Sequence, residues 1–270
     1  MMSRTVLTRY RAVSDDIGDL RTQRPLPNHE LEQIDPFLFL NHHGPQVYPP
    51  DNRGLPFGPH PHRGFETVTF ILEGSLAHRD SGGHESVIHA GGVQWMTAGR
   101  GLEHAELSPE EFLRDGGPLE ILQLWVNLPA RLKMTEPRYQ GLQRDAIPSI
   151  VRDGVTVNLI SGTFDGQRGP IESITGVFMC TLQMPAGSRI TLDAPRAHNV
   201  FCYDVREMYL VHFDNDDDTV DLETDRETTI LFGHAQPYRE PVVAHGPFVM
   251  NTRAEIMQAF RDYQLGLFGT

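Results

Sequence analysis

Glycine recurs so often in the first half of this chain that long helices do not fit between the glycines. Twelve glycines lie from Gly54 to Gly117, several of them in adjacent pairs. The short runs between them are rich in threonine, valine, isoleucine and aromatic residues, which favour β-strands. These runs are Glu66–Leu72, His84–His89, Val93–Ala98 and Leu119–Asn127. Turn signals that recur about every ten residues are typical of a β-sandwich or a β-barrel.

The second half of the chain repeats this pattern more faintly. Short runs that favour β-strands are again separated by glycines, and they are Val155–Ile160, Val177–Gln183, Glu207–Phe213 and Thr228–Phe232. Between the two halves, Arg131–Gly141 is polar and contains a proline, as expected of a linker. We therefore predict an all-β fold of two tandem β-barrels, one over residues 1–135 and one over residues 136–270.

A few short helices complete the expected fold, and one near the carboxyl terminus has a clear signature. Thr252 is followed three residues later by Glu255, and this capping box satisfies two backbone donors at a helix start. Ile256, Phe260 and Tyr263 then recur at helical spacing. The sequence therefore predicts a terminal helix that packs through this face.

Charge and composition narrow the class of protein. The chain has 23 basic and 36 acidic residues, a formal net charge of −13, which opposes direct binding to nucleic acid or anionic lipid. No apolar run approaches the ~20 residues of a membrane helix, and the stretch MMSRTVLTRYRAVSDDIGDL lacks the apolar core of a secretory signal. Two cysteines are too few for a disulfide scaffold. We expect a cytoplasmic protein that is a monomer.

The most informative short motif is His60-Pro61-His62. On an extended segment, residues two apart point to the same side, so both imidazoles face one way. If this alternation continues past Gly64, the same face carries Glu66, Val68, Phe70 and Leu72, and Thr67, Thr69 and Ile71 lie opposite. Buried imidazoles without partners are costly there, and a metal ion would satisfy them. Ordinary surface or core histidines explain this motif equally well when it is taken alone.

A second motif, GRGLEHAE, ends some forty residues later and changes that balance. His104 and Glu106 are again two apart and face one side of a strand. Three histidines and one carboxylate on neighbouring strands form a mixed nitrogen and oxygen site that suits Fe, Mn, Ni or Cu. An octahedral ion held by four protein ligands keeps two positions open, which indicates a site that binds a reactant.

Together these motifs resemble a known family. Gly54-x5-His60-x-His62-x3-Glu66 follows the first motif of the cupin superfamily, except that the closing glycine, Gly74, comes one residue late. The stretch from His60 to Glu106, with GFETV, QWMTAGRG and HAE, closely resembles the pirin family, and so does GPFVMNTRAEIMQAFRDYQLGLFG near the end. The resemblance spans nearly all of the chain and implies a bicupin, two cupin β-barrels in tandem.

The pirin resemblance also implies a ligand set. It places iron in the first barrel, on the residues that match the family's metal ligands, which are His60, His62, His104 and Glu106. Most other cupins take the carboxylate from their first motif, here Glu66. The pirin pattern favours Glu106 as the fourth ligand and leaves Glu66 as a helper outside the inner shell. Fe(II) is the expected cofactor, and Mn, Ni, Cu or Zn are the alternatives.

The activity that the resemblance implies is that of a quercetin 2,3-dioxygenase. Such an enzyme opens the central ring of a flavonol with O2 and releases carbon monoxide. Glu106 is then the expected catalytic proton acceptor, and the face of Val68, Phe70 and Leu72 is expected to hold the planar aromatic substrate. The alternative is an iron-containing, redox-sensing binding protein, a transcriptional co-regulator that acts through protein partners. The negative charge permits a basic protein partner.

The remaining histidines carry weaker signals. No second metal ion is expected in the second barrel, because its histidines are scattered and have no carboxylate at ligand spacing. These are His198, His212, His234 and His245. In the first half, the other histidines are expected to be mostly surface groups, with the rim of the cavity as the alternative place. They are His42, His43, His78, His84 and His89.

Overall fold

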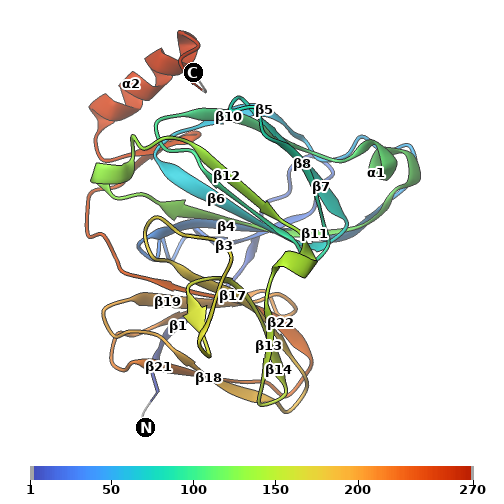
Figure 1. The fold of residues 1–270 in the computed structure, drawn as a ribbon, viewed down its shortest axis with the longest axis vertical. Coiled ribbons are helices and arrows are strands. Elements are labelled where there is room, and N and C mark those ends of the chain that lie inside the picture. The colour runs from blue at the N-terminus through green and yellow to red at the C-terminus, as the bar shows by residue number, and fades with distance from the viewer. Residues whose placement is uncertain (1–2, 269–270) are drawn as a thin grey trace. The chain divides into compact units, whose positions relative to one another are not determined.

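The computed structural model describes residues 3–268, and within them the chain is mostly β-structure (Figure 1). It divides into two compact units. We call the unit that contains residues 39–144 the amino-terminal barrel and the unit that contains residues 145–237 the carboxy-terminal barrel. Each is a cupin-type β-barrel, so the prediction of an all-β bicupin is confirmed. Neither α-helix of the described residues has the length and apolar character needed to cross a membrane.

Two sheets form the amino-terminal barrel. The larger has the strand order β12-β9-β6-β11-β4-β3-β2 and the smaller β5-β10-β7-β8. The strands are β2 (Val13–Ser14), β3 (Thr22–Leu26), β4 (Phe37–Tyr48), β5 (Phe57–His62), β6 (Phe65–Glu73), β7 (Ser75–Asp80), β8 (Glu85–His89), β9 (Val93–Thr97), β10 (Leu102–Leu107), β11 (Gly117–Asn127) and β12 (Arg138–Leu142). The helix α1 (Glu110–Asp115) and the 3-10 turns η1 (Ala130–Leu132) and η2 (Arg144–Ala146) connect strands.

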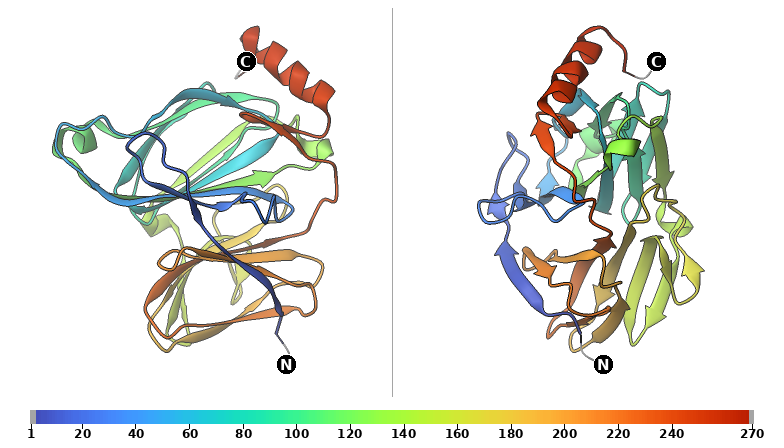
Figure 2. Two further views of the ribbon diagram at one scale, coloured as in Figure 1. Left: turned by 180° about the vertical axis from the view of Figure 1, so that it is seen from behind. Right: turned by 90° about the vertical axis from the view of Figure 1, so that its left-hand side faces the viewer.

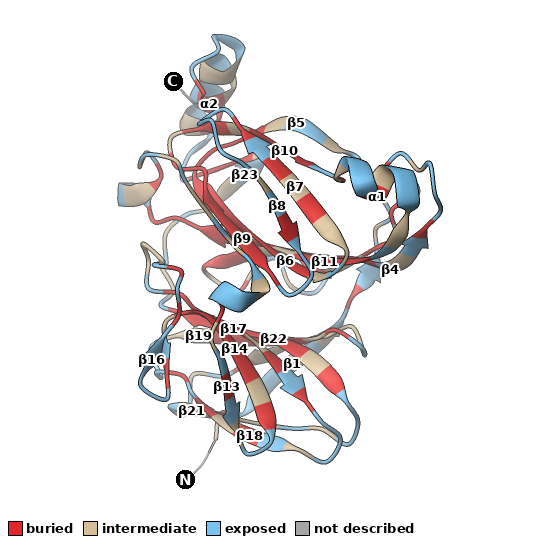
Figure 3. Cartoon of the chain, turned by 45° about the vertical axis from the view of Figure 1, so that its right-hand side comes forward, coloured by how far each residue is buried: buried red, intermediate tan, exposed pale blue. Residues whose placement is uncertain are grey.

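The carboxy-terminal barrel is built on a seven-stranded antiparallel sheet of order β1-β20-β19-β22-β17-β14-β13. Its strands, with those of two short hairpins, are β1 (Val6–Arg11), β13 (Ser149–Arg152), β14 (Val155–Ser161), β15 (Thr163–Phe164), β16 (Gln167–Arg168), β17 (Phe178–Met184), β18 (Arg189–Asp193), β19 (Asn199–Asp204), β20 (Tyr209–Phe213), β21 (Thr219–Glu223) and β22 (Thr228–Ala235). Val155, Leu182 and Phe232 lie in one buried cluster, which alternate residues of the strands form. Figure 3 shows the buried stretches of these strands in red.

The structure divides the chain differently from the predicted ranges 1–135 and 136–270. Strand β1 pairs with β20 and so belongs to the carboxy-terminal barrel. Residues from Tyr238 onward belong to the amino-terminal barrel, and they form β23 (Val243–His245), β24 (Phe248–Met250) and α2 (Arg253–Gln264) (Figure 2). The physical reason is long-range pairing and packing, which leave no mark on local composition.

Helix α2 begins as its sequence predicts. The Thr252 hydroxyl accepts a hydrogen bond from the backbone N–H of Glu255, and the Glu255 carboxylate accepts one from the Thr252 hydroxyl at 2.8 Å. The predicted face is also the packed one. Ile256 is buried, and Phe260 and Tyr263 pack against the same cluster, which includes Phe248 and other residues of the amino-terminal barrel.

Candidate metal centre

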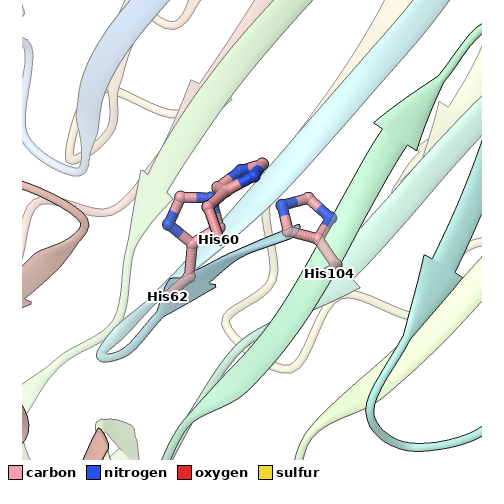
Figure 4. Close-up of side chains that lie close together, drawn as sticks. All are labelled: His60, His62 and His104. Carbon is pink, nitrogen blue, oxygen red and sulfur yellow. The ribbon is translucent and has the colours of Figure 1, made fainter. Parts of the chain in front are cut away.

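Three histidines from two paired strands meet in the amino-terminal barrel. Strands β5 and β10 run antiparallel, with His104 opposite His60 and Leu102 opposite His62. Ligand atoms of His60, His62 and His104 all lie within 4.8 Å of one another. Figure 4 shows the three rings turned toward one another. The prediction that the two histidines of HPH share one side is therefore confirmed, and His104 joins them from the neighbouring strand.

Backbone carbonyls fix the orientation of two of these rings. Nδ1 of His60 lies 2.7 Å from the carbonyl oxygen of Gly58, and Nδ1 of His62 lies 3.3 Å from that of Pro247. A carbonyl oxygen can only accept, so Nδ1 carries the hydrogen in each ring and Nε2 keeps its lone pair. This is the usual arrangement of a metal-binding histidine, whose second nitrogen donates to the protein.

The third ring has no such partner. His104 is 2% exposed, and neither ring nitrogen forms a hydrogen bond with any residue from 3 to 268. An unsatisfied buried polar group costs about 1–3 kcal/mol, and a metal ion bound at Nδ1 or Nε2 would remove that cost for the nitrogen that it binds. Burial, with the nearby histidines adding to it, lowers the pKa of His62 to about 3 and that of His104 well below its usual value. Both rings are therefore neutral near pH 7, as ligation requires.

Glu106 lies on the same strand face as His104 but outside this three-histidine cluster. It is 2% exposed, and three side chains donate to its carboxylate. The Thr69 hydroxyl and the Gln94 amide donate to Oε1, at 3.0 and 2.5 Å, and the Gln123 amide donates to Oε2 at 2.5 Å. Oε2, which accepts from one donor, keeps more free lone-pair capacity than Oε1, which accepts from two. That Glu106 ligates a metal ion stays a prediction.

The histidine site, in a cupin barrel, fits the family that the sequence resembles. A sequence model of the family Pirin matches residues 19–126, and one described as the Pirin C-terminal cupin domain matches residues 179–269. The chain belongs to the pirin family. Proteins of the cupin and pirin families typically bind a metal ion, and the chemistry of the three histidines fits a divalent transition metal.

Several known proteins are similar to this chain over nearly its whole length. A pirin-like protein of Caulobacter vibrioides is 40% identical over 275 residues, which are 97% of this chain and 97% of the relative. Pirin of Homo sapiens is 36% identical, over 94% of this chain and 89% of its own length. The crystal structure of a quercetin 2,3-dioxygenase from Acinetobacter baumannii superposes with a TM-score of 0.91 and 32% identity. It covers 100% of this chain and 99% of its own.

One prediction about this pirin site is wrong, and it concerns the face of β6. Thr69 donates to Glu106, and the Phe65 ring lies 4.9 Å from the ring of His62, so the odd-numbered residues face the site. The face of Val68, Phe70 and Leu72 is therefore the opposite one. The cause is Gly64, whose φ of +88° ends β5 and starts a separate strand, so the alternation does not carry through the turn.

This face also provides an aromatic wall, which was not predicted from the sequence. Trp125 lies opposite Thr67 in the β6–β11 ladder and therefore shares the face of Phe65. Its ring is 5.4 Å from that of His62 and 4.4 Å from that of Phe65. The aromatic residue in the run Leu119–Asn127 was visible in the sequence, but its facing depends on strand register.

Glu66, the competing carboxylate, lies on the other face of β6. It pairs with Thr97, whose hydroxyl donates to Oε1 at 2.6 Å, and Oε2 has no hydrogen-bond partner among the described residues. Burial raises the pKa of Glu66 to about 7. The three-histidine cluster does not include it. Its separation from Thr69 by strand alternation is consistent with a place outside the inner shell.

Three other histidines expected at the surface are buried instead. They are His42, His43 and His78. His78 lies 5.4 Å, ring to ring, from His104, and its Nε2 is 2.9 Å from the Asp80 carboxylate. His84, about half exposed, contacts the same carboxylate at 3.1 Å. The two-residue spacing of Leu76, His78 and Asp80, all buried, was the signal for an inward-facing row.

Proposed function

We propose that this pirin-family chain is a metal-dependent 2,3-dioxygenase acting on quercetin-type flavonols. The reaction joins one O2 to the flavonol, opens the central ring and releases carbon monoxide. One observation carries the proposal: ligand atoms of His60, His62 and His104 lie within 4.8 Å of one another, and both ring nitrogens of His104 lack a hydrogen-bond partner among residues 3–268, in a chain that superposes on a quercetin 2,3-dioxygenase. The fit extends over the whole chain, including both barrels.

In this proposal His60, His62, His104 and Glu106 hold the metal ion. We propose Fe(II), with Mn, Ni, Cu and Zn as ions that the same donors accept. When bound, the ion supplies Lewis acidity that lowers the pKa of a coordinated hydroxyl group. The carbonyls of Gly58 and Pro247 keep the Nε2 atoms of His60 and His62 aimed inward. His104 contributes a ring with no competing hydrogen bond in the described part of the chain.

Glu106 is the proposed proton acceptor for the flavonol hydroxyl. Gln123 donates to Oε2, whereas Thr69 and Gln94 both donate to Oε1, so Oε2 is the less occupied oxygen. The three donors also hold the carboxylate in one orientation, which a general base needs. The proton moves from the substrate hydroxyl to this oxygen and can return to the opened product.

The aromatic wall of Phe65 and Trp125 is the proposed contact for the planar substrate. The two rings are 4.4 Å apart, and Trp125 also stacks on Phe39 at 4.6 Å. Aromatic rings offer a flat, apolar surface for a flavonol and exclude water from the reacting atoms. This replaces the earlier expectation that Val68, Phe70 and Leu72 line the substrate.

The test is aerobic turnover of quercetin by iron-loaded protein, with carbon monoxide measured in the headspace. We expect carbon monoxide in proportion to quercetin consumed, and none from a His60→Ala variant that has been loaded in the same way. A wild-type protein that keeps its metal but forms no carbon monoxide would contradict the enzyme. A redox-dependent capture of a basic protein partner in that case would favour the binding-protein alternative.

A further inference from the structure

The last segment of the amino-terminal barrel in chain order contacts β5, the strand that carries His60 and His62. We call residues 238–268 the carboxy-terminal segment. Its Pro247 carbonyl accepts from His62, and its Val249 N–H donates to the carbonyl of Arg63 at 3.0 Å. The Arg63 side chain reaches Asp262 on α2, with Nη1 2.6 Å from Oδ2. These two side chains are only 5% and 16% exposed, so water screens the ion pair weakly.

The same segment contacts the second ligand strand. The Tyr263 hydroxyl donates to Oε2 of Glu103 at 2.9 Å, and Glu103 directly precedes His104 on β10. Phe268 packs against the turn before β10 so closely that a Cβ on Gly101 would lie 2.8 Å from its ring. The Phe268 ring also lies 4.6 Å from the guanidinium of Arg63. One aromatic ring therefore contacts the residue after β5 and the turn before β10.

A buried lysine ties the segment to the turn after His62. Lys133, 1% exposed, donates from Nζ to the carbonyls of Gly64 and Val249, each at 2.9 Å, and to the Asn127 amide oxygen at 2.7 Å. A Cβ on Gly64 would collide with the Val249 carbonyl, so the two backbones touch without an intervening side chain. The turn cannot move independently of β24.

Strand β5 needs such support because it is an edge strand. In its sheet, of order β5-β10-β7-β8, it pairs with β10 alone, and the ladder is irregular between His104 and Glu106. Two of the three histidines therefore sit on a strand whose other edge lacks a β partner in that sheet. Metal affinity requires ligand atoms held within about 0.5 Å of their bound positions.

We propose that the carboxy-terminal segment positions the metal ligands, with Asp262 and Tyr263 as positioning residues. Asp262 holds the strand end of His62 through Arg63, and Tyr263 holds the start of β10 through Glu103. The inference rests on the proposed metal site and adds that the retention of metal is set partly by α2. Neither residue touches the metal or the substrate.

The experiment measures the loss of Co(II) from the loaded protein to an excess of chelator, together with the visible ligand-field spectrum of bound Co(II). Asp262→Ala should release Co(II) about tenfold faster, as for other groups that orient ligands, and should alter the spectrum. Asp262→Asn should recover part of the loss, because its amide oxygen still accepts from Arg63. Tyr263→Phe, which removes one oxygen atom, should have a smaller effect of the same sign.

Met257→Ala is the matched control, because Met257 is on the same helix and 56% exposed. It should leave both readouts unchanged. If folded Tyr263→Phe and Asp262→Asn proteins match the wild type in rate and spectrum, the positioning role is wrong, even where Asp262→Ala fails to fold. If the wild type retains no more Co(II) than His60→Ala, the metal site itself is wrong, and the inference falls with it.

Discussion

Histidines converge in both barrels, but their surroundings differ. In the amino-terminal barrel, His60, His62 and His104 meet near a strand that also carries the Glu106 carboxylate. In the carboxy-terminal barrel, His198 and His234 approach to 2.9 Å between their Nδ1 atoms. A guanidinium lies near this pair, because Arg4 donates from Nη1 to the backbone carbonyl of His198 at 2.9 Å.

Burial, with a contribution from the charge of Arg4, lowers the pKa of both His198 and His234. A fixed positive charge that disfavours a proton disfavours a divalent cation as well. The His234 ring also stacks on Phe178, with an interplanar angle of 1°. We therefore expect that converging imidazoles alone do not make a metal site in the carboxy-terminal barrel, because the positive charge of Arg4 disfavours a cation beside His198 and His234.

The largest expected effect tests this contrast directly. His104→Ala should abolish metal retention, because it removes the ring that has no hydrogen-bond partner between residues 3 and 268. The double variant His198→Ala, His234→Ala should keep the metal content of the wild type. Elemental analysis of purified protein measures both. A loss of metal from the double variant would mean that the carboxy-terminal barrel binds an ion despite Arg4.

The next effect separates the two carboxylates of the amino-terminal barrel. Glu106→Ala should abolish metal retention and turnover, because it removes the one anionic donor of the proposed ligand set. Glu66→Ala should keep the metal and lower the rate by about tenfold or less, since it acts from the other face of β6. The reverse pattern would show that this chain uses the general cupin arrangement, and Glu66 would then be the ligand.

Acid should reveal a smaller difference between the barrels. The pKa values of His62 and His234 are both lowered to about 3 in the folded chain. In the unfolded chain these histidines bind protons near pH 6.5, whereas in the folded chain they stay neutral until the pH is much lower. Stability should fall as the pH drops from about 6.5 toward 3, by about 1.4 kcal/mol per pH unit for each fully buried ring. Added metal should oppose this at His62 alone.

Melting temperatures at pH 5.5, with and without Co(II), test that expectation. The wild type and His234→Ala should both gain stability from the ion, because binding is linked to folding. His62→Ala should gain little. A response to metal in His62→Ala as large as in the wild type would place the ion elsewhere.

The smallest effect concerns the substrate face of β6. Trp125→Phe should raise KM for quercetin about threefold, in line with ~0.5–1.5 kcal/mol for an aromatic contact, and should leave metal content unchanged. Val68→Ala should leave KM unchanged and lower the melting temperature instead, because Val68 is buried on the opposite face. Steady-state kinetics with both variants decide between the two faces.

Features that depend on neighbouring residues, such as helix starts and strand positions, could be predicted from the sequence. The capping box fixed the start of α2, glycine spacing located the strands, and the two-residue spacing of His60 and His62 placed both rings on one side. The facing of β6 could not be predicted, since one residue at a positive φ, Gly64, resets the alternation. Nor could the aromatic wall, because the position of Trp125 depends on the register of β11 with β6.

Long-range pairings were also beyond the sequence. Nothing near Val6 indicates that β1 completes a sheet with residues about two hundred positions away, and nothing near Asp262 indicates Arg63 as its partner. The partner of the His78 ring is a similar case, since it stacks on Tyr139 at 4.0 Å, a residue of the predicted linker. A single histidine in a strand carries no sign of which ring it will stack on.

The exchange of chain ends between the barrels has a consequence for synthesis on the ribosome. Strand β1 is synthesised long before its partner β20. His62 and Arg63 are likewise synthesised long before their respective partners, Pro247 and Asp262. Neither barrel can close around its own contiguous stretch of nascent chain, and contacts between distant residues slow folding. The histidines therefore leave the ribosome long before their supports do, so a firmly held metal ion should be acquired only after translation has passed α2.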